Sequence, residues 1–161
     1  MSIQITTKLQ FNEHQARYPN FSYEELACQH CGSMDLPLEF LIALQELREA
    51  VAKPMQITSG YRCAEHPIEK KKSSPGYHNR GAVDIAAHGE FAYHILKIAL
   101  SDDRGWTGIG INVPSFIHLD RREEPTIWKY RCSVKTVNTS AIVETMDNAK
   151  CVLAQCVNTT H

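Results

Sequence analysis

The sequence predicts an α+β domain, in which a small antiparallel sheet packs with helices. Residues 34–54 have apolar side chains at helical spacing, whereas "AVDIA" (82–86) and "SFIHLD" (115–120) have the composition of short strands. Helical and strand-like segments follow one another along the chain with no internal repeat. We expect this domain to cover residues 1–130 and to be followed by an atypical tail, residues 131–161, that is either helical or disordered.

The helix predicted within residues 34–54 follows a polar and irregular stretch, residues 1–22. Asp35 is placed to cap this helix, Pro37 suits its first turn, and Pro54 lies just past its end. The residues that form its apolar stripe are Phe40, Leu41, Leu44, Leu47 and Val51.

The elements that follow are predicted in the order strand, loop, strand, helix and hairpin. "MQITSGYR" (55–62) is predicted to form a short strand that enters a turn, and residues 64–80 are predicted to form a loop before "AVDIA". "GEFAYHILKIALS" (89–101) returns to helical spacing. "WTGIGINV" (106–113) and "SFIHLD" (115–120) are both strand-like, and a short turn between them predicts a hairpin.

Composition and charge exclude several functional classes. The net charge of −1 gives no reason to expect bulk electrostatic binding of nucleic acid or of an anionic membrane. No stretch approaches the ~20 apolar residues of a membrane-spanning helix. The first residues also lack the apolar region of a signal peptide. We therefore expect synthesis in the cytoplasm and no nucleic-acid or membrane partner, and we expect a monomer.

His78 and Asp84 are the first candidates for metal ligands. His78 lies in the predicted loop, and Asp84 lies in a strand, where an acidic residue between Val83 and Ile85 is unusual. Gly81 can allow the loop to fold back, so that the two side chains converge. Imidazole nitrogen and carboxylate oxygen are ligands that zinc accepts. On spacing alone, a capping histidine and a solvent-facing aspartate remain the alternative.

A second pair of polar residues, His118 and Asp120, lies on "SFIHLD". Because side chains two apart on a strand share a face, both point to the same side, and Ile117 and Leu119 point to the other. The pair fits a metal ligand beside a carboxylate. It equally fits a surface salt bridge with one of the two arginines that follow.

Four separated motifs, taken in order, resemble the zinc D-alanyl-D-alanine carboxypeptidase family, which shares a fold with the hedgehog signalling domain. The motifs are "ITSGYRCAEHP", "SPGYHNRGAVDIA", "GIGINVPSFIHLD" and "PTIWKY". The family includes D-alanyl-D-alanine carboxypeptidases and L-alanyl-D-glutamate endopeptidases, which cut peptidoglycan stem peptides. The resemblance covers residues 20–130, is strongest to short phage and bacterial members, and implies a hedgehog/DD-peptidase-like fold.

The resemblance also implies a zinc site. His78, Asp84 and His118 match the three zinc ligands of the family, so the implied cofactor is Zn²⁺. Arg62, in "SGYR", matches an arginine that binds a carboxylate or carbonyl of the substrate, a role that suits a planar guanidinium. The implied reaction is metal-assisted amide hydrolysis, in which a carboxylate passes a proton to the leaving amine.

That carboxylate is assigned to Asp120. Many family members have an acid three residues before the last histidine ligand, or a second histidine two residues before it, and here these positions are Ser115 and Phe116. "HLD" resembles the His-x-Asp of short members, and strand geometry puts Asp120 on the face of His118. The alternative is that Asp120 orients His118 from behind.

The chain has six cysteines, and three of them lie in zinc-like patterns. Cys28 and Cys31 form a C-x-x-C, and Cys63 and His66 form a C-x-x-H, which together have the ligand types of a structural zinc site. A disulfide between Cys63 and either Cys28 or Cys31 is one alternative, and packing of free thiols is the other.

We therefore expect a zinc-dependent hydrolase of peptidoglycan stem or cross-link peptides, of the D,D-carboxypeptidase or the L-alanyl-D-glutamate endopeptidase type. Its partner is the stem peptide, which it reaches after release from the cell or as part of a virion, in the manner of a phage lysis enzyme. The alternatives are a non-catalytic zinc-containing module that binds cell-wall peptides and a structural virion component.

Overall fold

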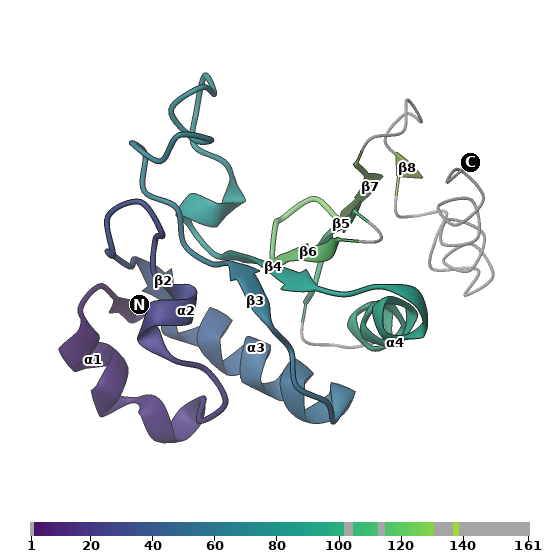
Figure 1. The fold of residues 1–161 in the computed structure, drawn as a ribbon, viewed down its shortest axis with the longest axis horizontal. Coiled ribbons are helices and arrows are strands. Elements are labelled where there is room, and N and C mark those ends of the chain that lie inside the picture. Colours follow the sequence, from purple (N-terminus) through teal and green to yellow (C-terminus); the bar gives the residue numbers. More distant parts are fainter. Residues whose placement is uncertain (1, 102–104, 113–114, 131–136, 139–161) are drawn as a thin grey trace. The chain divides into compact units, whose positions relative to one another are not determined.

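The computed structural model describes residues 2–101, 105–112, 115–130 and 137–138. The chain divides into two compact units, Met1–Ile85 and Ala86–His161. Figure 1 shows the helices and strands of both. Both contain helices and strands, which confirms the predicted α+β class. Among the described residues, none of the helices combines the length and the apolar character that a membrane crossing requires.

The first unit contains three α-helices and two pairs of short strands. Its helices are α1 (Lys8–Glu13), α2 (Tyr23–Leu26) and α3 (Leu38–Val51), with the 3₁₀ turns η1 (Gln15–Arg17) and η2 (Tyr77–Asn79). Its strands are β1 (Gln4–Ile5), β2 (Leu36–Pro37), β3 (Ile57–Ser59) and β4 (Ala82–Ala86), whose last residue belongs to the second unit. Strand β1 pairs with β2 and β3 pairs with β4, both antiparallel.

The prediction that residues 1–22 are irregular is wrong, because this segment contains β1, α1 and η1. Two capping boxes start its short helices, since Thr7 and Gln10 bond reciprocally at α1 and Ser22 and Glu25 do the same at α2. Each box satisfies backbone donors that the first turn would otherwise leave unpaired. A helix this short has too few apolar positions for the periodicity to be visible in the sequence.

Helix α3 confirms the main helix prediction, with a different start. Its N-cap is Pro37, and no side chain caps it, so Asp35 does not have the predicted capping role. The reason is that Leu36 and Pro37 pair with β1 as strand β2, which separates Asp35 from the helix. The helix ends at Val51, and its C-cap residue Ala52, two residues before Pro54, has left-handed backbone angles.

The second unit contains helix α4 (Gly89–Leu100) and strands β5 (Gly108–Asn112), β6 (Phe116–Asp120), β7 (Thr126–Lys129) and β8 (Val137–Asn138). Strands β5 and β6 form the predicted antiparallel hairpin. Strand β7, from "PTIWKY", pairs parallel with β5 and antiparallel with β8. The predictions for the tail, including its three cysteines, otherwise lie outside the described residues.

The register of the hairpin separates an apolar face from a polar one. Ile109 pairs with Leu119 and Ile111 pairs with Ile117, and all four side chains are buried. The alternate positions pair Gly108 with Asp120 and Gly110 with His118. Because alternate residues of a strand point to opposite faces, His118 and Asp120 share a face, and the residue opposite each of them on β5 is a glycine.

Candidate metal centre

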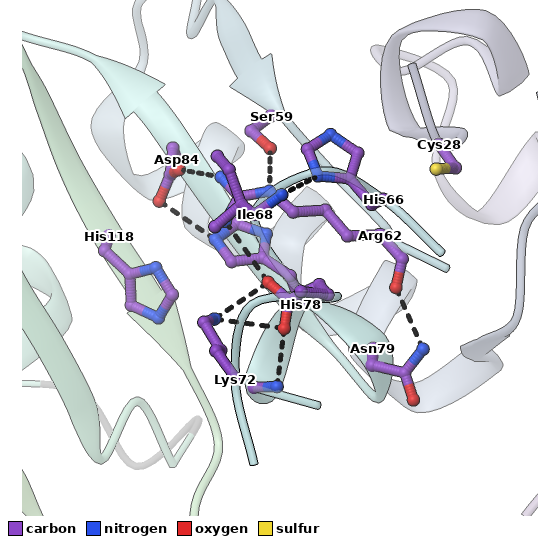
Figure 2. Close-up of polar contacts among 12 residues, drawn as sticks. Cys28, Ser59, Arg62, His66, Ile68, Lys72, His78, Asn79, Asp84 and His118 are labelled. Carbon is purple, nitrogen blue, oxygen red and sulfur yellow. Dashed lines mark hydrogen bonds and ion pairs between the residues drawn. The ribbon is translucent and has the colours of Figure 1, made fainter. Parts of the chain in front are cut away.

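His78 and Asp84 meet within the first unit. His78 lies in η2 and Asp84 in β4, and Gly81 between them has a φ of +137°, a backbone conformation that favours glycine. The chain therefore turns back between the two residues, as predicted, and the His78 Nε2 lies 3.2 Å from the Asp84 Oδ1 (Figure 2). Both side chains are buried.

The hydrogen bonds of His78 define which ring nitrogen carries a lone pair. Its Nδ1 lies 2.7 Å from the carbonyl oxygen of Gly60, which can only accept, so Nδ1 carries the proton and donates. In the neutral ring, Nε2 is then an acceptor that faces the carboxylate oxygen of Asp84. A cation bound between two such buried acceptors would stabilise this arrangement. A backbone carbonyl that accepts from the second ring nitrogen, here Nδ1, is typical of histidine ligands of metals.

Arg62 contacts Asp84 from the other side. Its NH2 donates to the Asp84 Oδ2 at 2.9 Å, and its Nε donates to the Ser59 Oγ at 2.9 Å (Figure 2). The backbone of Arg62 is fixed as well, since its carbonyl accepts from the Asn79 side chain at 2.9 Å. The guanidinium thus orients one carboxylate oxygen of Asp84, and the other oxygen faces His78.

Glu69 is a buried acid in the loop before η2, and its residue is only 2% exposed. Its carboxylate accepts from the Lys72 ammonium at 2.9 and 3.0 Å and from the Gly76 amide at 2.6 Å, and it lies 3.6 Å from the Arg62 NH1. Burial alone would raise the pKa of the Glu69 carboxyl, but these hydrogen bonds and charges outweigh it and lower that pKa. The Glu69 carboxylate is therefore ionised, and its charge links the loop to the Arg62 guanidinium.

His118 and Asp120 meet within the second unit. The His118 Nε2 lies 2.9 Å from the Asp120 Oδ2, which confirms that strand β6 presents both on one face. Glycine is required on the facing strand, because a Cβ added at Gly108 would lie 1.9 Å from the Asp120 Oδ1. A Cβ at Gly110 would in turn lie 2.6 Å from the ring of Trp128, which packs against the His118 ring with centroids 5.1 Å apart.

Asp120 is fully buried and is held by Arg122. The Arg122 Nε donates to Oδ1 at 2.9 Å, its NH2 donates to Oδ2, and its backbone amide donates to Oδ1 at 3.2 Å. Burial alone would raise the pKa of the Asp120 carboxyl, but the hydrogen bonds from Arg122 and His118 lower it. The ionised carboxylate accepts from the Nε2 of His118, so that Nδ1 is the nitrogen with a lone pair in the neutral ring.

The predicted ligands have the donor chemistry that zinc requires. His78, Asp84 and His118 supply two imidazole nitrogens and one carboxylate, which is a donor set typical of catalytic zinc sites. Each has a partner that sets its tautomer or orientation, namely the Gly60 carbonyl, Arg62 and Asp120 respectively. The residues present therefore fit a zinc ion.

Two functional features were missed by reasoning from the sequence. Glu69 was not predicted to contact Arg62, because it lies in a loop whose path no periodicity encodes. A salt bridge of His118 or Asp120 with one of the next two arginines was expected only as a surface alternative to the metal site, whereas Arg122 contacts an Asp120 that is fully buried. The sequence did contain a signal for the second missed feature. Gly108 and Gly110 alternate in a strand, which is the pattern expected where a strand must leave room for large side chains.

A comparison with protein families finds one family model that matches most of this chain. A family model described as Peptidase M15 matches residues 19–120, which contain Arg62, all three candidate zinc ligands and Asp120. No curated protein matches the chain.

Proposed function

We propose that this chain, which belongs to the peptidase M15 family, uses a zinc ion to hydrolyse an amide bond in peptidoglycan stem or cross-link peptides. Members of the family are metal-dependent peptidases. The observation that carries the proposal is the buried pair of His78 and Asp84, whose Nε2 and Oδ1 atoms lie 3.2 Å apart, with a partner behind each side chain. His118 is the third ligand of the proposal.

The roles of the chain's own residues follow from their contacts. His78, Asp84 and His118 would hold the zinc ion, which when bound supplies a Lewis acid for the scissile carbonyl and lowers the pKa of a water molecule. Arg62 fixes the Asp84 carboxylate, and its planar guanidinium is also suited to a substrate carboxylate, the role that the family resemblance implies. Glu69 keeps the Arg62 loop in place.

Asp120 has the contacts of a residue that orients His118. Both of its oxygens accept from Arg122, and one also accepts from His118, so the carboxylate has little capacity left to take a proton from water. We infer that Asp120 is a positioning residue, the second of the two roles expected from the sequence. A non-catalytic module that binds zinc and cell-wall peptides remains the second candidate, because Ser115 and Phe116 stand where other members have an acid or a histidine.

An assay with cell-wall peptides distinguishes the zinc peptidase from the non-catalytic binding module. We expect the zinc-loaded protein to cleave purified muropeptides and the chelator-treated protein to be inactive until zinc is restored. Mass spectrometry of the products identifies the bond, since a carboxypeptidase removes a terminal D-alanine and an endopeptidase cuts after L-alanine. Binding of muropeptides without any cleavage by the zinc-loaded protein would establish the module instead. A phage lysis or virion setting is part of the proposal and predicts that the protein lyses cells only from outside the membrane.

Substitution of Asp120 by asparagine separates its two possible roles. Asparagine keeps the shape but loses the charge that holds His118 and Arg122, so we expect zinc affinity to fall by about 10- to 100-fold. Added zinc should then restore most of the hydrolysis. If Asp120 were instead the proton acceptor, Asp120→Asn would bind zinc normally and stay inactive at any zinc concentration. Titration of zinc against activity and against metal content measures both quantities.

A further inference from the structure

Three cysteine thiols converge in the first unit. As sulfur donors, they differ in chemistry from the histidine and carboxylate ligands proposed above. The Sγ atoms of Cys28, Cys31 and Cys63 all lie within 4.8 Å of one another. All three are free thiols. Cys28 is buried, Cys63 is half-buried and Cys31 is exposed, so the cluster lies at the surface of the unit and is open to an ion from solvent.

Backbone pairing brings the cysteines together from two distant segments. The Tyr61 amide donates to the Leu26 carbonyl at 2.8 Å, which joins the end of α2 to the chain after β3. Gly60 makes this approach possible, because a Cβ there would lie 2.3 Å from the Leu26 oxygen. Cys28 and Cys63 each follow this junction by two residues, and their side chains therefore meet.

The C-x-x-C segment is folded as a tight loop with donors directed at sulfur. Cys28 donates its amide to the Ser33 carbonyl at 2.7 Å, and Gly32, at a φ of +73°, donates to the Cys28 carbonyl at 2.7 Å. The Cys63 amide donates to the Cys28 Sγ at 3.4 Å, and the Cys31 Sγ lies 2.9 Å from the Ser33 Oγ. Hydrogen bonds to sulfur favour the thiolate, which is the form that binds a metal.

The number of thiols favours a metal ion over a disulfide. A disulfide joins two sulfur atoms and would leave the third thiol of this group without a covalent partner. A tetrahedral zinc ion instead accepts three thiolates together with one nitrogen ligand. His66 is the nitrogen donor best placed by the sequence, since it completes a C-x-x-H with Cys63 and its amide donates to the Cys63 carbonyl at 3.0 Å.

We propose that Cys28, Cys31 and Cys63 bind a structural zinc ion, with His66 as the fourth ligand. His66 is not yet part of the convergent group, and its Nδ1 accepts from the Ile68 amide at 3.2 Å (Figure 2). Binding through either nitrogen ends this hydrogen bond, because the zinc ion occupies one lone pair and the ring proton occupies the other nitrogen. Zinc at this site would join the α2 end to the segment that carries Arg62, next to Cys63 in the chain.

Metal content and optical absorption test this proposal in the full chain. We expect two zinc ions per chain in the wild type and one in Cys63→Ser, while Cys132→Ser, a control that makes the same substitution and leaves Cys28, Cys31 and Cys63 in place, keeps both. Replacement of zinc by cobalt should produce an intense thiolate-to-cobalt charge-transfer band, which a site of histidine and aspartate cannot give. The band needs no mutation, so the test remains valid if Cys63→Ser does not fold.

The same measurements keep this proposal separate from the peptidase proposal. His118→Ala should lose one zinc ion and keep the thiolate band. Absence of the band in the wild-type protein would overturn the cysteine site and leave the peptidase proposal intact. A mass two hydrogens lower, which indicates a disulfide, together with no cysteine-bound metal would do the same. His66→Ala should weaken binding at this site and His30→Ala should not. The reverse result, or no effect of His66→Ala, would reject His66 as the fourth ligand.

Discussion

Substitution of His118 by alanine is expected to abolish hydrolysis of cell-wall peptides. In the proposed centre His118 is one of only three protein ligands, and its loss leaves a zinc ion held by His78 and Asp84 alone. A bound metal contributes several kcal/mol to the transition state, so we expect kcat/KM to fall by at least about 10³-fold. Hydrolysis of muropeptides at fixed zinc, followed by mass spectrometry, measures the loss.

Two further variants show whether this loss comes from the metal. His118→Gln can still donate to Asp120 but offers no imidazole nitrogen, so it should fold like the wild type and remain inactive. His88→Ala is the matched control in the same unit, because His88 is exposed and makes no capping hydrogen bond at α4. An active His118→Gln, or a His118→Ala with unchanged zinc content, would remove His118 from the ligand set.

Long elements and the face of each strand could be predicted from the sequence because both depend on local periodicity. The stripe that includes Leu41 and Leu44 predicts α3, and the alternation around Ile117 and Leu119 places His118 on the opposite face. The turn that brings His78 to Asp84 was also predictable, since Gly81 is the residue type that its backbone conformation requires.

Contacts made through loops could not be predicted in the same way. Glu69 reaches Arg62 across a loop with no regular hydrogen-bond pattern. The sequence left open whether Arg121 or Arg122 pairs with this strand, and Arg122 turns back onto Asp120 just after β6 ends. Asp35 does not cap α3 for a similar reason. Strand β2, which separates Asp35 from the helix, forms by pairing with β1, a segment about thirty residues earlier in the chain. Each of these features depends on tertiary contacts that local propensity does not encode.

Removal of the Arg62 side chain is expected to have the second-largest effect, on both stability and catalysis. Arg62→Ala removes the guanidinium partner of the Asp84 carboxylate and one of the two cations that contact Glu69 among the described residues, and the Arg62, Asp84 and Glu69 side chains are each no more than 12% exposed. Loss of one partner of a buried ion pair costs about 3 to 5 kcal/mol of the free energy of unfolding. Because Asp84 also loses its orientation, zinc affinity should fall by about 10- to 100-fold.

Conservative and control substitutions distinguish this positioning role from a role in substrate binding. Arg62→Lys keeps the charge but replaces the planar fork, which bonds Ser59 through Nε and Asp84 through NH2, by a single nitrogen, so we expect partial recovery of stability and little recovery of zinc affinity. Arg80→Ala removes an exposed arginine of the same unit that contacts Tyr77, and should cost less than about 1 kcal/mol. Urea unfolding and zinc titration measure these effects. If Arg62→Ala raised KM alone, with unchanged stability and zinc affinity, Arg62 would serve the substrate only, and its contact with Asp84 would have no part in holding the metal ligand.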